Sequence, residues 1–310
     1  MMATGHKPVL LEGAVSALAL EDGSVVVDAT FGGGGHARRV LQEVPTGGVI
    51  GIDRDPAAAW RARDLLGDDR FSFVTGPYDE VLWGMVERGE RADAVLFDLG
   101  LSSFQIDEPG RGFSYVVEGP LDMRMDPESG VSAAEYLNTV EVAELIETLG
   151  SYGDVPRGEA RRVAREVVRR RPLATTTDLH DAVRAAVGWK ERGGNPAKRV
   201  FQAVRVRVND ELEGLRRALR ATERLLVSGG RLVVITFQSG EDRIVKRFIA
   251  EREGRCVCPP ELPVCVCGAS PVFRRGAVVR PLEEEVRENP RSASARLRSA
   301  TRTSEPPGDG

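Results

Sequence analysis

The chain has 310 residues, a length that suits about two domains. Hydrophobic residues make up 41% and charged residues 29%, which supports folded cores and excludes a chain that is disordered throughout. The 43 basic and 47 acidic residues give a formal charge of −4, which excludes a globally basic nucleic-acid-binding protein but permits local basic patches. The sequence has no run of about 18 apolar residues and no recognisable signal peptide, so we expect a cytoplasmic protein without a membrane span.

Short and almost continuously apolar segments predict the buried strands of a parallel sheet. The first four are Val25–Asp28, Val49–Asp53, Phe71–Val74 and Ala94–Asp98. The next, Arg231–Phe237, begins about 130 residues after the fourth, whereas a whole β-α-β unit needs only about 30 residues. The sequence therefore predicts a doubly wound α/β sheet that is interrupted by roughly 100 extra residues.

The extra residues have the apolar period of amphipathic helices. Ser132 and Glu135 fit a capping box before one helix, and we expect the helix that follows it to end at Gly150. A returning segment that Asn195 opens is either one bent helix or two. The predicted domains are a discontinuous α/β domain at 1–103 and 205–285, an inserted helical domain at 104–204, and a basic, partly disordered tail at 286–310.

A glycine-rich loop, Gly32–Gly35, follows the first strand and precedes a helix. Glycines in this place let the backbone approach a ligand closely and leave helix N–H groups facing it. Asp53 ends the next strand, where an acid accepts hydrogen bonds from ribose hydroxyls. This arrangement predicts a nucleoside-cofactor site, and the loop alone is compatible with both NAD and S-adenosylmethionine.

The end of the fourth strand favours one of these cofactors. Asp98, Ser102 and Ser103 follow that strand, and ligands of open parallel sheets lie outside the carboxyl ends of the strands. Methyl transfer to an exocyclic amine needs acceptors that orient the N–H groups, and a carboxylate with two hydroxyls meets this need. A hydride-transfer site more often uses a His, Tyr or Lys, which is absent from this segment. We therefore predict methyl transfer, with Asp98, Ser102 and Ser103 as the catalytic residues.

The chain resembles the bacterial RsmH (MraW) family of S-adenosylmethionine-dependent methyltransferases. The resemblance covers nearly the whole length, and its most specific motif is the run from Gly119 to Asp126. The other matching motifs are His6–Leu11, Thr30–His36, Ile52–Pro56, Phe97–Ser103, Arg111–Ser114, Phe201–Arg205, Glu241–Lys246 and Asn289–Ser292.

This resemblance implies a class I methyltransferase sheet with a helical insertion, and N4-methylation of one cytidine in the decoding region of 16S rRNA within the small ribosomal subunit. It also implies contacts to S-adenosylmethionine from Gly34, Gly35, His36, Asp53, Tyr78, Asp98 and Gln105. The chain departs from the family at Gln238, where the family usually has His. Because Gln both donates and accepts hydrogen bonds, it can replace a His that orients the base.

Several features of the sequence allow more than one interpretation. Arg157–Arg171 is rich in arginine and forms either a solvated helix face or a contact to RNA phosphates; the arginines of the tail have the same alternatives. Asp122–Asp126 is either a structural ion-pair loop or a wall of the cytidine pocket. His6 lines the cleft or is an ordinary residue. The four cysteines bind zinc, stay free thiols or form disulfides: Cys256, Cys258, Cys265 and Cys267.

Two other functions stay open on the residues alone. One is an NAD-dependent oxidoreductase, which the glycine loop permits. The other is a ribosome-assembly factor that keeps the cofactor site without catalysis. Binding of NADH or of S-adenosylmethionine distinguishes the first, and a methyl-transfer assay on small subunits distinguishes the second.

Overall fold

The computed structural model describes residues 8–188, 195–254 and 271–303. The chain divides into two compact units, which we call the sheet unit, Met1–Gly100 with Leu212–Gly310, and the helical unit, Leu101–Glu211. The helical unit thus begins slightly before the predicted residue 104 and ends slightly after the predicted residue 204. Among the described residues, no helix is both long and apolar enough to cross a membrane.

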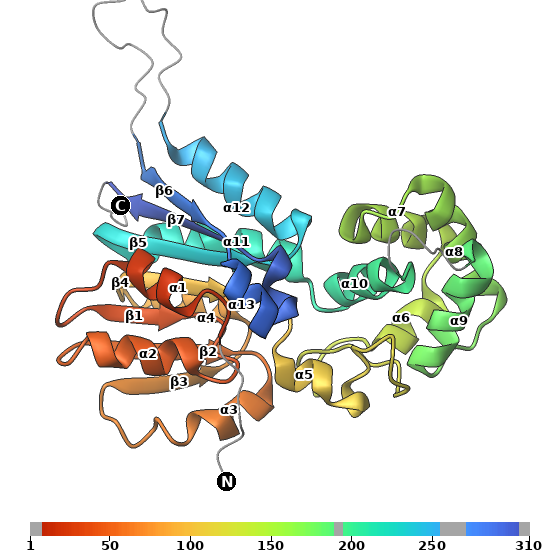
Figure 1. Cartoon of the computed structure of the whole chain (residues 1–310), viewed down its shortest axis with the longest axis horizontal. Coiled ribbons are helices and arrows are strands. Elements are labelled where there is room, and N and C mark those ends of the chain that lie inside the picture. Colours follow the sequence, from red (N-terminus) through yellow and green to blue (C-terminus); the bar gives the residue numbers. More distant parts are fainter. Residues whose placement is uncertain (1–7, 189–194, 255–270, 304–310) are drawn as a thin grey trace, which may run out of the picture. The chain divides into compact units, whose positions relative to one another are not determined.

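One sheet holds the strands of the described part of the sheet unit, in the order β3-β2-β1-β4-β5-β7-β6. Strands β1 to β5 run parallel to one another, and β7 runs antiparallel to both β5 and β6. This confirms the predicted doubly wound α/β fold (Figure 1). The strands are β1 Val25–Asp28, β2 Gly48–Asp53, β3 Phe71–Thr75, β4 Ala92–Asp98, β5 Leu226–Thr236, β6 Phe273–Val279 and β7 Arg296–Arg302.

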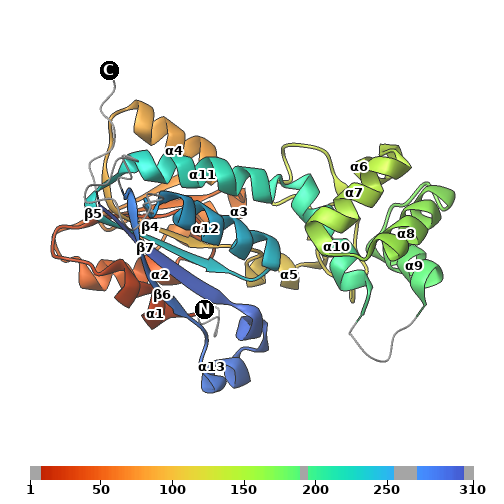
Figure 2. The ribbon, with the colours of Figure 1, turned by 90° about the horizontal axis from the view of Figure 1, so that it is seen from above.

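The chain moves outward from β1 to β3 and then returns to β4 beside β1. The crossover helices therefore change faces at this point, and Figure 2 shows α1 and α2 on one face and α4, α11 and α12 on the other. Such a reversal opens a crevice at the carboxyl ends of the strands. The helices of this unit are α1 Leu11–Leu18, α2 Gly35–Glu43, α3 Pro56–Ala62, α4 Tyr78–Glu87, α11 Glu211–Leu225, α12 Ser239–Arg252, α13 Glu283–Glu288 and the 3₁₀ turn η2 Pro290–Ser294.

The predicted tail at 286–310 is wrong for its central part. Residues Arg296–Arg302 form β7, an inner strand of the sheet between β5 and β6. Leu297 and Ala300 are buried, and Arg298 donates to the Asp242 carboxylate of α12 at 2.7 Å. The arginines suggested a solvated tail because the acid that neutralises them lies more than 50 residues away in the sequence. Residues 304–310 lie outside the described part.

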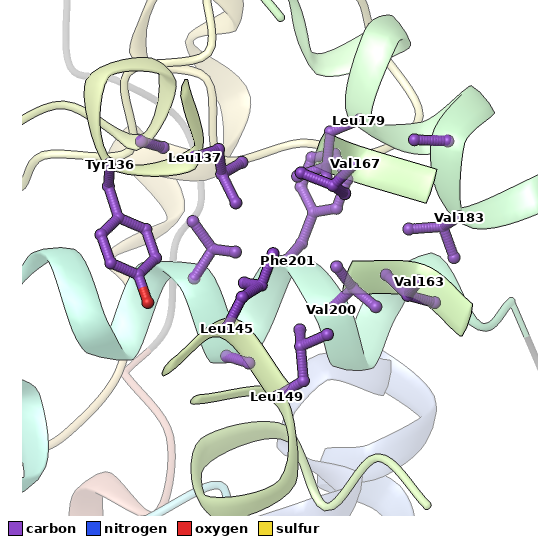
Figure 3. Close-up of a cluster of buried hydrophobic side chains, with 14 of the residues drawn as sticks. Tyr136, Leu137, Leu145, Leu149, Val163, Val167, Leu179, Val183, Val200 and Phe201 are labelled. Atoms are coloured by element: carbon purple, nitrogen blue, oxygen red, sulfur yellow. The ribbon is translucent and has the colours of Figure 1, made fainter. Parts of the chain in front are cut away.

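The helical unit has a core of its own. Buried side chains from five helices meet in it, among them Leu137, Leu149, Val167, Leu179 and Phe201 (Figure 3). Apolar faces at helical spacing therefore find their partners within the insertion. The elements are α5 Ser103–Asp107, η1 Pro109–Arg111, α6 Ala133–Thr139, α7 Val142–Gly153, α8 Arg157–Arg169, α9 Thr176–Val187 and α10 Ala197–Val208.

The helix ends confirm one expectation, correct a second and decide between the two alternatives of a third. Ser132 and Glu135 form the predicted capping box of α6. Helix α7 continues past Gly150 to Gly153, and Asp154 ends it in the left-handed conformation at φ 50°. The returning segment is two helices rather than one, because Asp210 between α10 and α11 also has a left-handed φ of 52°.

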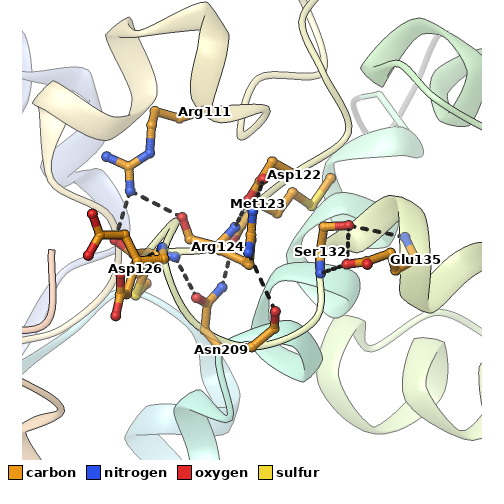
Figure 4. A network of polar contacts seen from close by, with 11 residues as sticks. Arg111, Asp122, Met123, Arg124, Asp126, Ser132, Glu135 and Asn209 are labelled. Carbon is orange, nitrogen blue, oxygen red and sulfur yellow. Dashed lines mark hydrogen bonds and ion pairs between the residues drawn. The ribbon is translucent and has the colours of Figure 1, made fainter.

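The loop Asp122–Asp126 is held by hydrogen bonds inside the helical unit (Figure 4). Met123 has a left-handed φ of 59°, which is costly for a side chain other than glycine. Asn209 compensates because its amide accepts from Met125 N and donates to Met123 O, both at 2.7 Å. Arg124 pairs with Asp122 at 2.7 Å. These contacts favour the structural interpretation of this loop.

Candidate active site

Three carboxylates stand at the carboxyl ends of three adjacent strands. Asp53, Asp28 and Asp98 are the last residues of β2, β1 and β4, which are neighbours in that order. Because parallel strands end at the same edge of a sheet, these side chains gather where the strand order reverses. The site is therefore built from acids on the rigid core of the sheet unit.

Asp98 has the fewest hydrogen bonds of the three acids among the described residues. Its Oδ1 atom is buried and has no hydrogen-bond partner among the described residues, while its Oδ2 lies 3.8 Å from Nδ1 of His36. Burial raises the pKa of Asp98 well above its usual value, and the charges of Asp28 and Glu241 raise it further. A cation placed beside Asp98 would reverse this effect and hold the carboxylate ionised.

Asp28, like Asp98, is a buried acid with a raised pKa. It is 2% exposed, and its Oδ2 has no hydrogen-bond partner in the described structure. Its Oδ1 accepts from Thr30 N at 3.3 Å. Burial raises the pKa of Asp28 to about 7, the Thr30 hydrogen bond opposes this rise, and the charge of Asp53 adds to it.

Asp53 holds the glycine loop and also faces the site. Its Oδ2 accepts from Gly32 N at 2.7 Å, and its Oδ1 accepts from Asp55 N at 2.9 Å. Burial nevertheless raises the pKa of Asp53. Each carboxylate oxygen can accept a second hydrogen bond, so these backbone contacts leave capacity for the two hydroxyls of a ribose.

The glycine loop is fixed by neighbouring arginines and by close packing. Arg61 donates to Gly32 O at 2.7 Å, and Arg38 donates to Gly33 O at 2.6 Å. A Cβ on Gly34 would lie 2.5 Å from the Phe31 ring, and Gly34 has a φ of +73°. A Cβ on Gly35 would lie 2.2 Å from Pro8. The protein's own packing therefore requires these two glycines.

His36 lies in the first turn of α2 and faces Asp98. It is 5% exposed, and burial lowers its pKa to about 4, against an opposing hydrogen bond with the Val9 backbone. The imidazole is therefore neutral at pH 7. Its contact with Asp98 does not supply the positive charge that the acids lack.

Tyr78 begins α4 directly after β3. Its ring packs edge-to-face on Phe97 of β4, with ring centroids 5.6 Å apart and planes at 87°. Phe97 is fully buried and Tyr78 is half-buried. The Tyr78 ring is thus a fixed, partly accessible aromatic surface at the same end of the sheet as the three acids.

Ser102, Ser103 and Gln105 belong to the helical unit and serve the start of α5. The Ser102 hydroxyl accepts from Gln105 N at 3.3 Å, and Gln105 Oε1 accepts from Ser102 N at 3.1 Å. These bonds form a capping box, and Gln105 is 5% exposed. The sequence-based prediction missed this capping function. The catalytic function of the serines and the cofactor contact of Gln105 stay predictions.

Gln238 follows β5, the strand next to β4. Its side-chain amide donates to Glu241 Oε1 at 2.7 Å, and its backbone N–H donates to Oε2 of the same carboxylate at 3.2 Å. Glu241 is 2% exposed and also accepts from Phe237 N at 2.9 Å. The residue that departs from the family pattern is therefore held by a buried acid.

Sequence reasoning missed four residues of this site. Asp28 was available by the same rule that selected Asp53 and Asp98, since it also ends a strand. Arg38, Arg61 and Glu241 had no such signal, because their function depends on which loop they reach in the fold. His6 and the four cysteines, Cys256, Cys258, Cys265 and Cys267, lie outside the described residues, so their alternatives stay predictions. Among the described residues, no His, Cys, Asp and Glu side chains group as metal ligands.

The arrangement suits a cationic ligand that carries a ribose. Asp28 and Asp98 have buried oxygens without hydrogen-bond donors, which a cation or a donor group would satisfy. Helix α2 begins at Gly35 without a side-chain cap, so its first N–H groups can bind an anionic group of the same ligand. The site thus fits a zwitterionic nucleoside with an additional positive charge.

Known proteins with similar sequences agree with this chemistry. The model of the MraW methylase family matches residues 3–303. The chain is 74% identical to the ribosomal RNA small subunit methyltransferase H of Rubrobacter xylanophilus, over 99% of this chain and 98% of that protein. It is 46% identical to the protein of the same name from Thermomicrobium roseum, over 97% and 94%, and 44% identical to that from Heliobacterium modesticaldum, over 96% and 99%.

Two of the solved structures that the chain resembles have low sequence identity to it. An rRNA methylase from Clostridium thermocellum has 13% identity and a TM-score of 0.43, over 97% of this chain and 99% of that chain. A methyltransferase from Streptococcus mutans in complex with SAH has 13% identity and a TM-score of 0.41, over 96% and 99%.

Proposed function

The chain belongs to the MraW methylase family, and from this premise we propose that it methylates the N4 amine of a cytidine in 16S rRNA. The predicted family, S-adenosylmethionine as cofactor, and methyl transfer to ribosomal RNA of the small subunit are confirmed. The observation that carries the N4 assignment is the partnerless Asp98 oxygen, an acceptor for the N–H of an amine at the end of β4.

The buried acids fit S-adenosylmethionine. When bound, this cofactor supplies an electrophilic methyl group on a positively charged sulfur. Asp28 and Asp98 lack a cationic partner among the described residues, and their pKa values are raised by burial. A sulfonium and an ammonium group provide the positive charge that keeps such carboxylates ionised.

Other residues of the sheet unit bind the remaining parts of the cofactor. We assign the ribose hydroxyls to the free acceptor positions of Asp53 and the adenine to the ring of Tyr78. The uncapped N–H groups at the start of α2, after Gly34, bind the carboxylate of the methionine part. Gly35 and His36 set the position of this helix start, because Pro8 packs on Gly35 and His36 is buried beside Asp98.

Asp98 acts on the substrate by orientation. Its ionised carboxylate accepts one N–H of the incoming amine and thereby fixes the direction of the nitrogen lone pair. His36 is neutral at pH 7 and leaves this carboxylate available as an acceptor. The amine proton leaves to water, and the hydroxyls of Ser102 and Ser103 provide further hydrogen bonds to the substrate. The target base must leave its stack to reach such a site.

We further assign the assembled small ribosomal subunit as the partner, and therefore the cytoplasm as the location. The helical unit supports this assignment because it carries exposed arginines on α8, and ribosomal RNA is bound largely through its phosphates.

The test is nucleoside mass analysis of 16S rRNA from unmethylated small subunits after incubation with the protein and labelled S-adenosylmethionine. We expect the label in N4-methylcytidine alone. Asp98→Asn serves as the matched variant, because it keeps the shape of the side chain and removes its charge. Label in another nucleoside would overturn the N4 assignment, and binding of the cofactor without any transfer would favour a non-catalytic assembly factor.

A further inference from the structure

We propose that a groove between α7 and α8 binds the phosphate backbone of the RNA substrate through three arginines, Arg157, Arg161 and Arg165, which we call the arginine stripe. The proposal rests on the proposed function, because it takes RNA as the substrate. It adds a defined contact surface that lies wholly within the helical unit and uses none of the residues of the active site.

The arginines of α8 and of its C-cap position, Arg170, fall into two sets. Arg169 and Arg170 pair with Glu166 at 2.6 Å, and Arg162 donates to Ala186 O at 3.1 Å. The three residues of the arginine stripe are exposed and have no ion pair or hydrogen bond among the described residues. They are four residues apart, so they lie in one row along the helix.

The row borders a groove of about 530 Å³. Arg157 and Arg161 form its α8 side, and Arg165 continues the row by one turn. Glu147 is the acid on the α7 side, and Gly150 opens the groove because no atom lies within 4 Å of a Cβ built there. The lining residues are Ala143, Ile146, Glu147, Gly150, Ser151, Val155, Arg157 and Arg161.

A strand of RNA fits this arrangement by its charge pattern. Successive arginines of the stripe are separated by about 6 Å along the helix axis, which gives a regular row of cations for the regular row of phosphates. Arg guanidinium groups bind phosphate in a bidentate manner. Glu147 repels anions from the α7 side and so directs the phosphates to α8. The apolar side chains of Ile146 and Val155 can contact the nucleoside part.

The charge test compares two triple variants of the full chain. Arg157→Gln, Arg161→Gln and Arg165→Gln remove the stripe, whereas Arg162→Gln, Arg169→Gln and Arg170→Gln remove the same charge from the rest of the same helix. Methyl transfer to small subunits is measured from 50 to 200 mM KCl. Loss of three phosphate contacts lowers the salt slope by about 2, so the KM ratio of stripe variant to wild type falls about 20-fold over this range. The control keeps the slope of the wild type.

A second variant tests the groove without changing charge. Gly150→Gln places a long neutral side chain into the groove and improves the helix propensity of α7, so the protein folds. We expect it to weaken the binding of an oligouridylate several-fold while the affinity for S-adenosylmethionine is unchanged. Poly-glutamate of equal length, used as a competitor, should not displace the oligouridylate.

The outcomes separate this proposal from the proposed function. If the wild type methylates subunits and both triple variants lose affinity equally, only net charge matters and the groove proposal is wrong. Displacement by poly-glutamate would assign the groove to an acidic peptide instead. If the wild type methylates no subunit but binds the cofactor, the proposed function fails, while oligouridylate binding still reports on the groove.

Discussion

Buried acids at the active site of the sheet unit and hydrogen-bonded acids of the helical unit have pKa values shifted in opposite directions. At the active site of the sheet unit, burial raises the pKa of Asp28 to about 7 and also raises that of Asp98. In the helical unit, hydrogen bonds from Arg169 and Arg170 lower the pKa of Glu166 to about 2, and Ser132 lowers that of Glu135. The two acids of the active site therefore favour the protonated form in the free protein, whereas these two acids of the helical unit favour the ionised form.

The largest effect that this contrast predicts is at Asp98. Asp98→Asn keeps the shape and one acceptor oxygen but removes the charge, so we expect turnover to fall by about 10²-fold or more while cofactor affinity falls less. Asp98→Ala should lose both. Single-turnover methylation paired with calorimetric titration of S-adenosylmethionine measures the two effects separately. Wild-type turnover in Asp98→Asn would exclude the orienting function and make Gln238 or the serines the next candidates.

Asp53 comes next. Asp53→Ala removes the charge-assisted hydrogen bonds to the ribose, worth about 1.5–3 kcal/mol, or a loss of affinity of roughly 10- to 150-fold. It also removes the acceptor for Gly32 N and Asp55 N. Asp53→Asn keeps an acceptor and should lose less. A calorimetric titration that gives an unchanged affinity in folded Asp53→Ala would show that this acid serves the loop alone.

The strands of the sheet and the ends of several helices were predictable because they depend on residues close in sequence. The apolar runs located β1 to β4, and Ser132 with Glu135 located the start of α6. Longer-range contacts were not predictable. Arg298 donates to Asp242, which is more than 50 residues away in the sequence. The segment that contains Arg298 was predicted to be a tail and forms β7. Helix α7 passes Gly150 because the residue at its end, Gly153, packs against the Arg199 backbone, with only 2.4 Å left for a Cβ.

At the active site, too, local sequence patterns predicted some residues and missed those that depend on longer-range contacts. Asp53 and Asp98 were found because each ends an apolar strand, and Asp28 was missed although it does the same. Ser102 and Gln105 were selected as functional residues, yet the structure also uses them to cap α5. Arg38 of α2 and Arg61 of α3 hold the glycine loop because the fold brings both helices next to it. No local sequence pattern predicts these two contacts.

The Asp122–Asp126 loop of the helical unit should affect stability rather than cofactor binding. Asn209→Ala leaves Met125 N and Met123 O buried without partners, while Met123 keeps its costly left-handed φ. We expect a loss of about 1–3 kcal/mol in the free energy of unfolding, measured by urea denaturation. Asn209→Asp keeps the acceptor and should lose less. A loss of S-adenosylmethionine affinity in Asn209→Ala would contradict a purely structural function of this loop.

The smallest effect is a pH dependence of cofactor binding, and its sign follows from the raised pKa values. Below pH 7 the free protein holds a proton on Asp28, because burial raises that pKa to about 7. A bound cation favours the ionised carboxylate, so binding releases the proton. The affinity for S-adenosylmethionine should therefore rise with pH up to about pH 7, by at most about tenfold per unit for this proton, and the raised pKa of Asp98 adds a rise of the same sign.

Two controls separate this effect from general acid unfolding. S-adenosylhomocysteine has the same adenosine and amino-acid parts but a neutral sulfur, so its affinity should rise less steeply with pH. Asp28→Asn removes the titrating group and should flatten the dependence for S-adenosylmethionine. In the free wild type, the folded state binds this proton more tightly than the unfolded chain, so stability should fall as pH rises from about 4 to 7. This fall should be smaller in Asp28→Asn, where the raised pKa values of Asp53 and Asp98 still contribute. Equal slopes for the two ligands in the wild type would show that Asp28 and Asp98 do not recognise the charge on sulfur. Their raised pKa values would then reflect burial in the fold and not selection of a cationic ligand.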